Sequence, residues 1–222
     1  MGLTLKDALR VNPDLNPKLF LPSPLDVLRI LDESPVREWL EYIAKEHTPP
    51  VKKARLLFVP CAAKKPYDPP RNILHKKLIE EVESRFKDVY MVAVSEPLAL
   101  EPREHWNFRW RGYNLIYDAP FFPWITRYGY KWDWEVAEKV WNRLSLVAAQ
   151  WFERNKHKFT KVIALATPTS GYRKILKRIP VEVYVPDFEP KVEVEYEENV
   201  ERIYTHPQVW SQLLKALKGT SS

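Results

Sequence analysis

Hydrophobic residues along this chain recur in two patterns, which predict two kinds of element. From about residue 51 onwards, short apolar runs alternate with longer segments in which apolar residues recur every three or four positions. The short runs, rich in β-branched residues, are typical of buried strands, and the longer segments are typical of helices with one buried face. The predicted strands cover residues 55–59, 89–94, 113–117, 161–166 and 181–185.

The segments between these runs predict helices over residues 72–86, 133–155, 168–177 and 208–217. Asp133 stands at the N-cap of the longest helix, where a short polar side chain can accept a hydrogen bond from a free backbone N–H. Strands that alternate with helices favour parallel pairing, because each helix returns the chain to the same end of the sheet. We therefore expect an α/β fold of three layers, a mostly parallel sheet with helices on both faces.

The N-terminal residues show only helical patterns, broken by Asn-Pro and Ser-Pro pairs. We expect residues 1–50 to form a helical N-terminal extension packed on the core, and residues 51–222 to form the α/β domain with a C-terminal helix. The acidic stretch 187–202 alternates valine with glutamate in its middle. That pattern fits an exposed edge strand and, equally, a flexible acidic arm.

Charge and cysteine content narrow the function classes. The chain has 222 residues, with 35 Lys and Arg against 29 Asp and Glu, and its net charge of +6 permits a nucleic-acid partner without requiring one. A single cysteine excludes an internal disulfide and favours a reduced, cytoplasmic protein. No apolar run reaches the roughly 18 residues of a membrane-spanning helix, and the first residues lack the apolar core of a secretory signal. We therefore expect a cytoplasmic protein with no membrane partner.

The first candidate site follows the strand predicted at 55–59. A proline ends that strand, and the only cysteine, Cys61, comes next, followed by Lys64, Lys65 and Tyr67. Ligands of open α/β sheets bind outside the carboxyl ends of the strands. We expect a reactive thiol here, with a pKa lowered by the two lysines. The alternative is a small buried cysteine without chemistry.

The second candidate follows the next predicted strand. Prolines, including Pro97, stiffen a loop that also carries Ser95, Arg103 and Glu104. Arg103 can bind a carboxylate or phosphate through two N–H groups, and Glu104 can bind an amine or accept a proton. The alternative is a rigid crossover in which these two side chains pair with each other. Because both loops follow parallel strands, we expect Cys61 and Arg103 to open into one common hollow.

An aromatic and basic stretch between residues 106 and 134 is the third candidate. Arg109, Trp110, Arg111 and Arg127 belong to it. Aromatic rings stack on bases and arginines bind phosphates, so this stretch predicts a nucleic-acid contact. Alternatively, it is a long loop folded over the core on its own aromatic side chains.

Two further observations concern small ligands. Thr169 and Ser170 follow the strand predicted at 161–166 and can bind an anion or amide at a helix start, although ordinary helix capping is the simpler explanation. The five histidines and one cysteine have no metal-ligand spacing, and no glycine-rich phosphate loop is present. We therefore predict no metal site and no bound cofactor.

Two of these segments together resemble a known family. Residues 60–67, Pro-Cys-Ala-Ala-Lys-Lys-Pro-Tyr, resemble the Pro-Cys-x-x-x-Lys-Pro-Tyr motif of archaeosine synthase, which is related to tRNA-guanine transglycosylase. Residues 95–104 are similar to that family's Ser-x-Pro-Leu-Gly-x-x-Pro-Arg-Glu segment. Residues 117–120 and 132–133 look like its Tyr-Asp-x-Pro and Trp-Asp. The resemblance covers about residues 55–166.

The resemblance implies a tRNA-modifying activity. Archaeosine synthase adds lysine to the nitrile of 7-cyano-7-deazaguanine within tRNA, and a radical S-adenosylmethionine partner protein then releases archaeosine. The residues at matched positions are Cys61, Lys65, Tyr67, Ser95, Pro97, Arg103 and Glu104. We expect the first three to be catalytic, and the others to bind substrate together with Lys64, Thr169 and Ser170.

Three positions depart from the family pattern. Pro70 and Ile73 stand where the family has serine and histidine, and Ala99 replaces a glycine. The family enzyme also carries a transglycosylase-like domain and a tRNA-binding PUA module, for which this chain is too short. The resemblance therefore implies tRNA as a partner, lysine or another small amine as a co-substrate, and a transglycosylase-like, PUA or radical S-adenosylmethionine partner protein.

These observations leave three functional hypotheses. In the first, the chain is an archaeosine-synthase-like domain in which a Cys61 thiolate adds to the nitrile and lysine displaces the resulting thioimide. In the second, it is a non-catalytic nucleic-acid-binding or assembly subunit of a tRNA-modification complex. In the third, it is a different nucleotide- or base-processing enzyme that uses the same sheet-end pocket. Turnover of modified tRNA separates the first hypothesis from the second.

Overall fold

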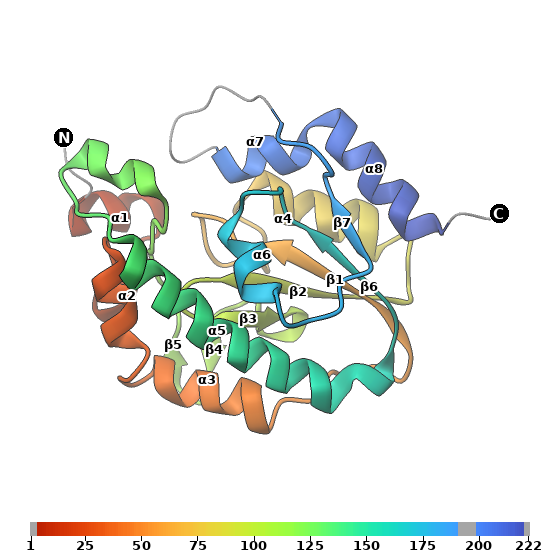
Figure 1. Cartoon of the computed structure of the whole chain (residues 1–222), viewed down its shortest axis with the longest axis horizontal. Coiled ribbons are helices and arrows are strands. Elements are labelled where there is room, and N and C mark those ends of the chain that lie inside the picture. Colours follow the sequence, from red (N-terminus) through yellow and green to blue (C-terminus); the bar gives the residue numbers. More distant parts are fainter. Residues whose placement is uncertain (1–3, 191–198, 220–222) are drawn as a thin grey trace.

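The computed structural model describes residues 4–190 and 199–219, and a five-stranded sheet lies at its centre (Figure 1). The strand order is β3-β2-β1-β6-β7. Four strands are parallel, and β3 at one edge is antiparallel to β2. The strands are β1 (Ala54–Pro60), β2 (Val89–Ser95), β3 (Ala99–Pro102), β6 (Phe159–Leu165) and β7 (Val183–Val185).

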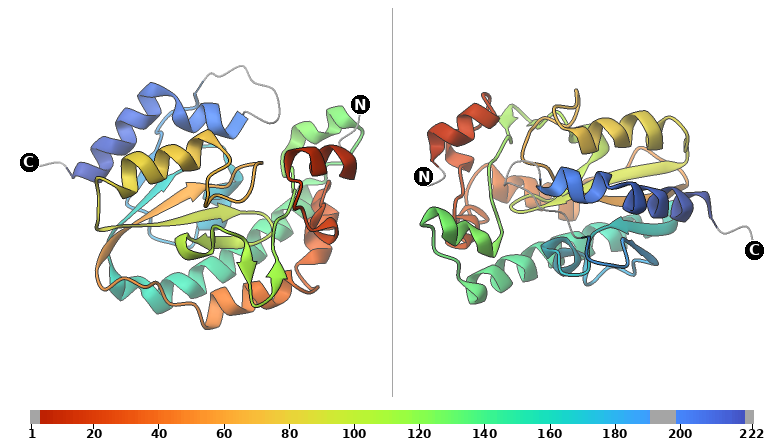
Figure 2. Two further views of the ribbon diagram at one scale, coloured as in Figure 1. Left: turned by 180° about the vertical axis from the view of Figure 1, so that it is seen from behind. Right: turned by 90° about the horizontal axis from the view of Figure 1, so that it is seen from above.

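Helices cover both faces of this sheet, so the predicted three-layer α/β fold is confirmed (Figures 1 and 2). One face carries α5 (Trp134–Asn155), which begins after its predicted N-cap, and α6 (Gly171–Leu176). The helices of the other face are α4 (Ile73–Lys77) with its π-helical continuation η2 (Leu78–Glu83), α7 (Asn199–Thr205) and α8 (Pro207–Lys218). None of the helices in the described residues is long and apolar enough to cross a membrane.

The N-terminal segment is helical, as predicted. It contains α1 (Leu5–Val11), the 3₁₀ turn η1 (Pro17–Leu19), α2 (Pro24–Ile30) and α3 (Val36–Lys45). Thr4 and Asp7 form a reciprocal capping box at the start of α1, and Ser23 caps α2. Helices α2 and α3 pack against α5, so this segment is joined to the core of the α/β domain.

Residues 113–117 do not form the predicted strand of the main sheet. Instead, β4 (Arg109–Trp110) and β5 (Tyr113–Asn114) make a separate two-stranded hairpin. Its turn passes through Arg111 and Gly112, which both have positive φ, as a tight hairpin turn requires. Residues 115–117 are buried in the core, which explains the apolar run in the sequence, but they do not pair as a strand.

The other differences concern connections. The loop predicted after β2 contains β3, which turns back along β2 as a hairpin. The acidic stretch 187–202 lies partly outside the described residues, because residues 191–198 are not described. Its last residues belong to α7, a helix that the sequence pattern did not predict. The remaining predicted helices are present within a few residues of their expected bounds, although α6 is shorter than the helix predicted at 168–177.

Candidate functional site

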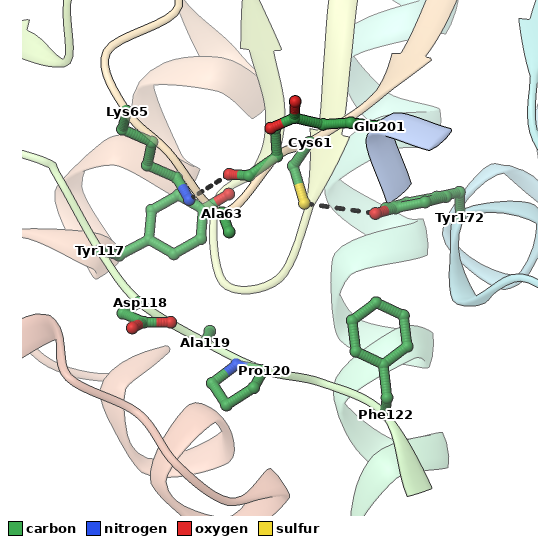
Figure 3. Close-up of a pocket in the computed structure, with 11 residues that line it drawn as sticks. Cys61, Ala63, Lys65, Tyr117, Asp118, Ala119, Pro120, Phe122, Tyr172 and Glu201 are labelled. Atoms are coloured by element: carbon green, nitrogen blue, oxygen red, sulfur yellow. Dashed lines mark hydrogen bonds between the residues drawn. The ribbon is translucent and has the colours of Figure 1, made fainter. Parts of the chain in front are cut away.

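A small pocket opens beside Cys61 at the carboxyl end of β1, and we call it the thiol pocket (Figure 3). It has about 40 Å³ of space for water-sized groups. At roughly 10–15 Å³ for one water, the thiol pocket holds about three water molecules. Its lining residues are Cys61, Ala62, Ala63, Lys65, Tyr117, Asp118, Ala119, Pro120, Phe122, Tyr172 and Glu201.

The sulfur of Cys61 is positioned by contacts with a strand and a helix. The backbone N–H of Cys61 donates to the carbonyl oxygen of Val94 at 3.1 Å, which continues the pairing of β1 with β2 beyond the strand. Its Sγ lies 3.3 Å from the hydroxyl of Tyr172 (Figure 3). Strand β1 therefore places the thiol, and α6 supplies its hydrogen-bond partner.

The predicted lowering of the thiol pKa is wrong. Burial raises the pKa of Cys61 to about 11, and the nearby charge of Lys65 offsets only part of this effect. The prediction assumed that Lys64 and Lys65, which are close to Cys61 in the sequence, would lower the pKa of its thiol. However, the loss of hydration of a thiolate outweighs attraction to one ammonium group. The thiol is therefore protonated at neutral pH in this arrangement.

Lys65 is buried, with an exposed fraction of 2%. Its ammonium donates to the carbonyl oxygen of Ala62 at 2.8 Å and lies 3.7 Å from the centre of the Tyr117 ring (Figure 3). Burial lowers the pKa of Lys65, and the electrostatic influence of Cys61, Glu101 and Asp118 opposes this effect in part. The cation is thus held at the wall of the thiol pocket by an aromatic face and a carbonyl.

Buried polar side chains lie behind this wall and form hydrogen bonds that fix its position. Tyr67 accepts a hydrogen bond from the Ala62 backbone N–H at 3.0 Å, so it fixes the turn after Cys61 and does not line the thiol pocket. Ser95 donates to Glu101 Oε1 at 2.6 Å. Burial raises the pKa of Glu101, with Lys65 as the largest opposing influence. The predicted residues Tyr67 and Ser95 therefore contribute to the shape and charge of the pocket from behind it.

Glu96 is a second buried acid behind the thiol pocket. Its Oε1 accepts a hydrogen bond from the Trp141 indole at 2.7 Å and packs against Gly171, where a Cβ would come within 3.0 Å of it. Burial raises the pKa of Glu96 to about 7. Its charge in turn contributes to the raised pKa of Cys61 and of Tyr172. A carboxyl group that titrates near neutrality is therefore within electrostatic range of the thiol.

Asn12 from the N-terminal segment holds the loop that follows Cys61. This buried side chain donates to the Ala63 carbonyl oxygen at 2.8 Å and accepts from the Lys65 backbone N–H at 2.7 Å. The sequence pattern presented Asn12 only as part of a helix-breaking Asn-Pro pair. Its role depends on a contact across some fifty residues, which local patterns do not show.

Replacing Asn12 with alanine is expected to destabilise the protein and to loosen the thiol pocket. Each buried backbone group left unpaired costs about 1–3 kcal/mol. We expect the free energy of unfolding in urea to fall by that order and alkylation of Cys61 by iodoacetamide to accelerate. Asn16→Ala is the control, because Asn16 bonds to Asn114 and Lys18, away from this loop. Equal alkylation rates in the two variants would contradict this role.

Arg103 and Glu104 do not line the thiol pocket, so within the described residues this pocket is not the common hollow expected for Cys61 and Arg103. Ala99 pairs with Ser95 and Pro102 with Val92, so β3 carries the chain back along β2 by about 10 Å. Arg103 there binds two carboxylates, Glu83 at 3.0 Å and Asp68 at 2.7 Å. The proposed alternative, a pair between Arg103 and Glu104, is not observed either.

Glu104 instead joins a group of metal-type ligands with His47 and His105, whose donor atoms lie within 4.8 Å of one another. The Trp151 indole can only donate, and it does so to His47 Nδ1 at 2.8 Å. The imidazole proton of His47 therefore lies on Nε2 and is donated to Glu104 at 2.7 Å. A metal ion on Nε2 would require an imidazolate, so these hydrogen bonds favour a structural pair over a metal centre.

The remaining predicted residues lie elsewhere. Pro97 is buried in the turn before β3, and Lys64 lines a neighbouring groove. The Thr169 N–H donates to Glu189 at 2.6 Å, and the Ser170 hydroxyl donates to the Thr167 carbonyl at 2.9 Å. Neither of these last two lines the thiol pocket, although Tyr172, two residues further on, does.

The aromatic and basic stretch is largely packed against the core. Trp110 is 6% exposed, and the Arg111 guanidinium lies over its ring while pairing with Glu46 at 2.6 Å. Arg109 and Arg127 are exposed. The stretch therefore exposes three arginines to solvent, of which Arg111 is paired with Glu46, whereas Trp110 has little surface on which a base could stack.

Several pocket residues were not among the sequence candidates. Asp118 was available as part of the Tyr-Asp-x-Pro likeness at residues 117–120, and Tyr172 followed a predicted strand. Glu201 lay in the acidic stretch, whose pattern predicted a strand or an arm and gave no indication of a pocket. All three come from segments distant from Cys61 in sequence, and only the fold brings them together.

The fold and this pocket define an α/β protein with a small, thiol-containing site at the carboxyl end of a parallel sheet. The sequence model of the family described as “Domain of unknown function (DUF5591)” matches residues 36–202, and the chain belongs to this family. Searches of curated proteins and of solved structures returned no match.

Proposed function

We propose that this chain is an archaeosine-synthase-like domain of tRNA modification. In this proposal, the thiol pocket receives the nitrile of 7-cyano-7-deazaguanine carried by tRNA, and the chain adds lysine to it. The proposal rests on the motif resemblance together with one structural observation, the Cys61 sulfur facing a pocket of about 40 Å³. A partner protein with a transglycosylase-like domain, a PUA module or radical S-adenosylmethionine chemistry belongs to the same proposal.

The size of the pocket favours a small, linear group. Room for about three waters is too little for a fused two-ring base, but a cyano group that projects from such a base needs only a narrow space. The base itself would then lie outside the pocket, and the partly exposed ring of Phe122 is available to contact it. Lys65 and Asp118 flank the pocket and can polarise the nitrile or position the incoming amine.

The chemistry needs no oxidant, reductant or cofactor. Addition of the Cys61 S–H across the nitrile forms a carbon–sulfur bond and places the proton on nitrogen, which gives a thioimide. The lysine amine then attacks the same carbon, the carbon–sulfur bond breaks, and the sulfur leaves with the proton of the amine as a thiol. The net change is nitrile plus amine to amidine.

Glu96 can supply the base that this addition requires. With a pKa of about 7, it is partly ionised at neutral pH, which is the tuning expected of a proton acceptor. The Tyr172 hydroxyl contacts the sulfur, and Gly171, the residue before it, packs against Glu96. In this proposal, Glu96 accepts the thiol proton and Cys61 adds to the nitrile as a thiolate.

The test is transfer of labelled lysine to tRNA that carries 7-cyano-7-deazaguanine. We expect the full chain, alone or with its partner protein, to attach lysine to this tRNA and not to tRNA with guanine at the same position. Mass spectrometry of the released nucleoside measures the product. Tight binding of the modified tRNA without any lysine transfer would contradict catalysis.

That second outcome defines the alternative, a non-catalytic nucleic-acid-binding or assembly subunit of a tRNA-modification complex. The thiol pKa of about 11 and the presence of Pro70 and Ile73 at the family serine and histidine positions favour it. His75, two residues beyond Ile73, stacks on the Tyr67 ring at 3.7 Å between ring centres and is buried, so it does not restore a histidine to the thiol pocket.

A further inference from the structure

A positively charged groove lies beside the thiol pocket and shares one wall with it. Among the described residues, its lining includes Lys64, Arg71, Lys76 and Arg202 against one carboxylate, Glu201, and its volume is about 330 Å³. Glu201 also lines the thiol pocket, so the two hollows are adjacent. The groove is several times larger than the thiol pocket. It is wide and lined by several cationic side chains, whereas the thiol pocket is narrow.

The single acid of the groove contributes little negative charge to its surface. Glu201 is 7% exposed, and its Oε2 accepts the backbone N–H of Ile73 at 3.0 Å. Arg71 donates to two neutral carbonyl oxygens, those of Lys65 at 2.6 Å and Val11 at 3.1 Å, so these bonds fix its position without neutralising it. Lys76 is highly exposed and only 3.9 Å from Glu80, a pairing that screening by water makes weak.

The floor of the groove is bonded to the loop that forms the thiol pocket. Besides the contact of Arg71 with the Lys65 carbonyl, the Asn72 amide donates to the Lys64 carbonyl at 3.1 Å. The backbone carbonyl of Lys64 therefore faces the floor of the groove. Its ammonium group has no hydrogen bond or ion pair within the described residues. An anion in the groove would therefore sit at a fixed position relative to Cys61.

We propose that this groove binds backbone phosphates of an RNA strand whose modified base enters the thiol pocket. The inference deepens the proposed function and rests on it for the identity of the strand. Lysine and arginine side chains bind phosphates by charge and carry no sequence information, which suits a surface that positions a nucleotide for chemistry next to it. Each phosphate contact releases counterions, so binding through the groove must weaken steeply with salt.

The positive surface continues on the other side of α4. A second, open hollow there is lined by Lys77, Lys215 and Lys218, with Trp210 between them. The Lys77 ammonium lies 4.5 Å from the centre of the Trp210 ring. Lys77 also lies 3.9 Å from the carboxylate of Glu81, so the further positive charge that a strand leaving the groove would meet comes from Lys215 and Lys218.

The double variant Lys64→Gln with Lys76→Gln tests this inference. The probe is an unmodified tRNA transcript with a fluorescent label, and anisotropy gives its Kd over a series of KCl concentrations. Loss of two phosphate contacts is expected to weaken binding about tenfold at physiological salt and to reduce the slope of log Kd against log salt by roughly 1.4–1.8. Arg71 is left unchanged, because its bonds support the fold.

The matched control is Lys139→Gln with Lys156→Gln, which removes two exposed charges from α5 and its end on the opposite face of the sheet. We expect this control to keep at least most of the affinity and the salt slope. Unchanged binding by the groove variant, or an equal loss in the control, would overturn the inference. So would a loss confined to Arg109→Gln with Arg127→Gln, which would place the RNA on the aromatic stretch.

These results are separable from the fate of the proposed function. A groove variant that loses tRNA affinity supports the inference whether or not lysine is transferred. If the wild-type chain transfers lysine and the groove variant binds tRNA normally, the proposed function stands. The proposal that the groove binds the tRNA is then overturned. Absence of tRNA binding by the wild-type chain at low salt would overturn the groove proposal outright.

Discussion

Replacing Cys61 with serine is expected to reduce lysine transfer by roughly 10³-fold or more, which is the scale on which enzymes lose activity without their nucleophile. Serine keeps the size and the hydrogen bond to Tyr172, which is 3.3 Å from the sulfur in the wild-type chain. An alcohol is a far weaker nucleophile than a thiol towards an electrophilic carbon, so the thioimide step would be lost. The measurement is the single-turnover rate of lysine transfer.

The tRNA affinity of the Cys61→Ser variant is expected to match that of the wild-type chain, because the sulfur lies in the thiol pocket and outside the basic groove. Cys61→Ala gives a second variant that cannot form any covalent adduct. Full lysine transfer by either variant would eliminate the thioimide and leave direct attack of lysine on the nitrile as the mechanism.

Replacing Glu96 with glutamine is expected to change the pH dependence of stability by about 3 kcal/mol. The folded pKa of Glu96 is about 7, above its ordinary value of 4.5. The folded state therefore binds this proton more tightly than the unfolded state. The contribution is fully present below pH 4.5, and it is lost as pH rises through about 7. Above pH 7, the wild-type chain carries a buried carboxylate, and its free energy of unfolding no longer includes this contribution.

Glutamine keeps an oxygen for the Trp141 indole and carries no charge, so the variant loses this pH dependence. Urea unfolding at a series of pH values measures the difference between variant and wild type, which should shift in favour of the variant as pH rises. Glu135→Gln, at an exposed position in the first turn of α5, provides the control. Parallel stability curves for Glu96→Gln and the wild type would show that Glu96 does not titrate in this range.

The central strands and the long helix could be predicted because their signals are local. Strands β1, β2 and β6 are apolar runs bounded by polar residues, and Asp133 marks the start of α5 through its own hydrogen bond to Val136 at 3.0 Å. Strand β3 could not be predicted, because two prolines dominate its segment. Pro102 is tolerated there because it ends an edge strand.

The site was predictable only in part, for a related reason. The rule that ligands gather at strand ends placed Cys61 and Lys65 at the pocket. It misplaced Arg103, because the antiparallel return of β3 depends on pairing that the sequence does not display. The two lysines next to Cys61 in the sequence gave the wrong direction for the thiol pKa, since burial is a property of the whole fold and outweighs a neighbouring lysine.

The two hydrogen bonds of Asn12 bear on where this protein can be divided. The family match begins at residue 36, inside the first turn of α3, yet Asn12 closes the loop behind Cys61 from well upstream of that point. A fragment trimmed to the matched residues would keep every strand of the sheet. It would still lose the two hydrogen bonds by which Asn12 holds the loop after Cys61. The part of the chain that shapes the thiol pocket is therefore longer than the part matched by the family model.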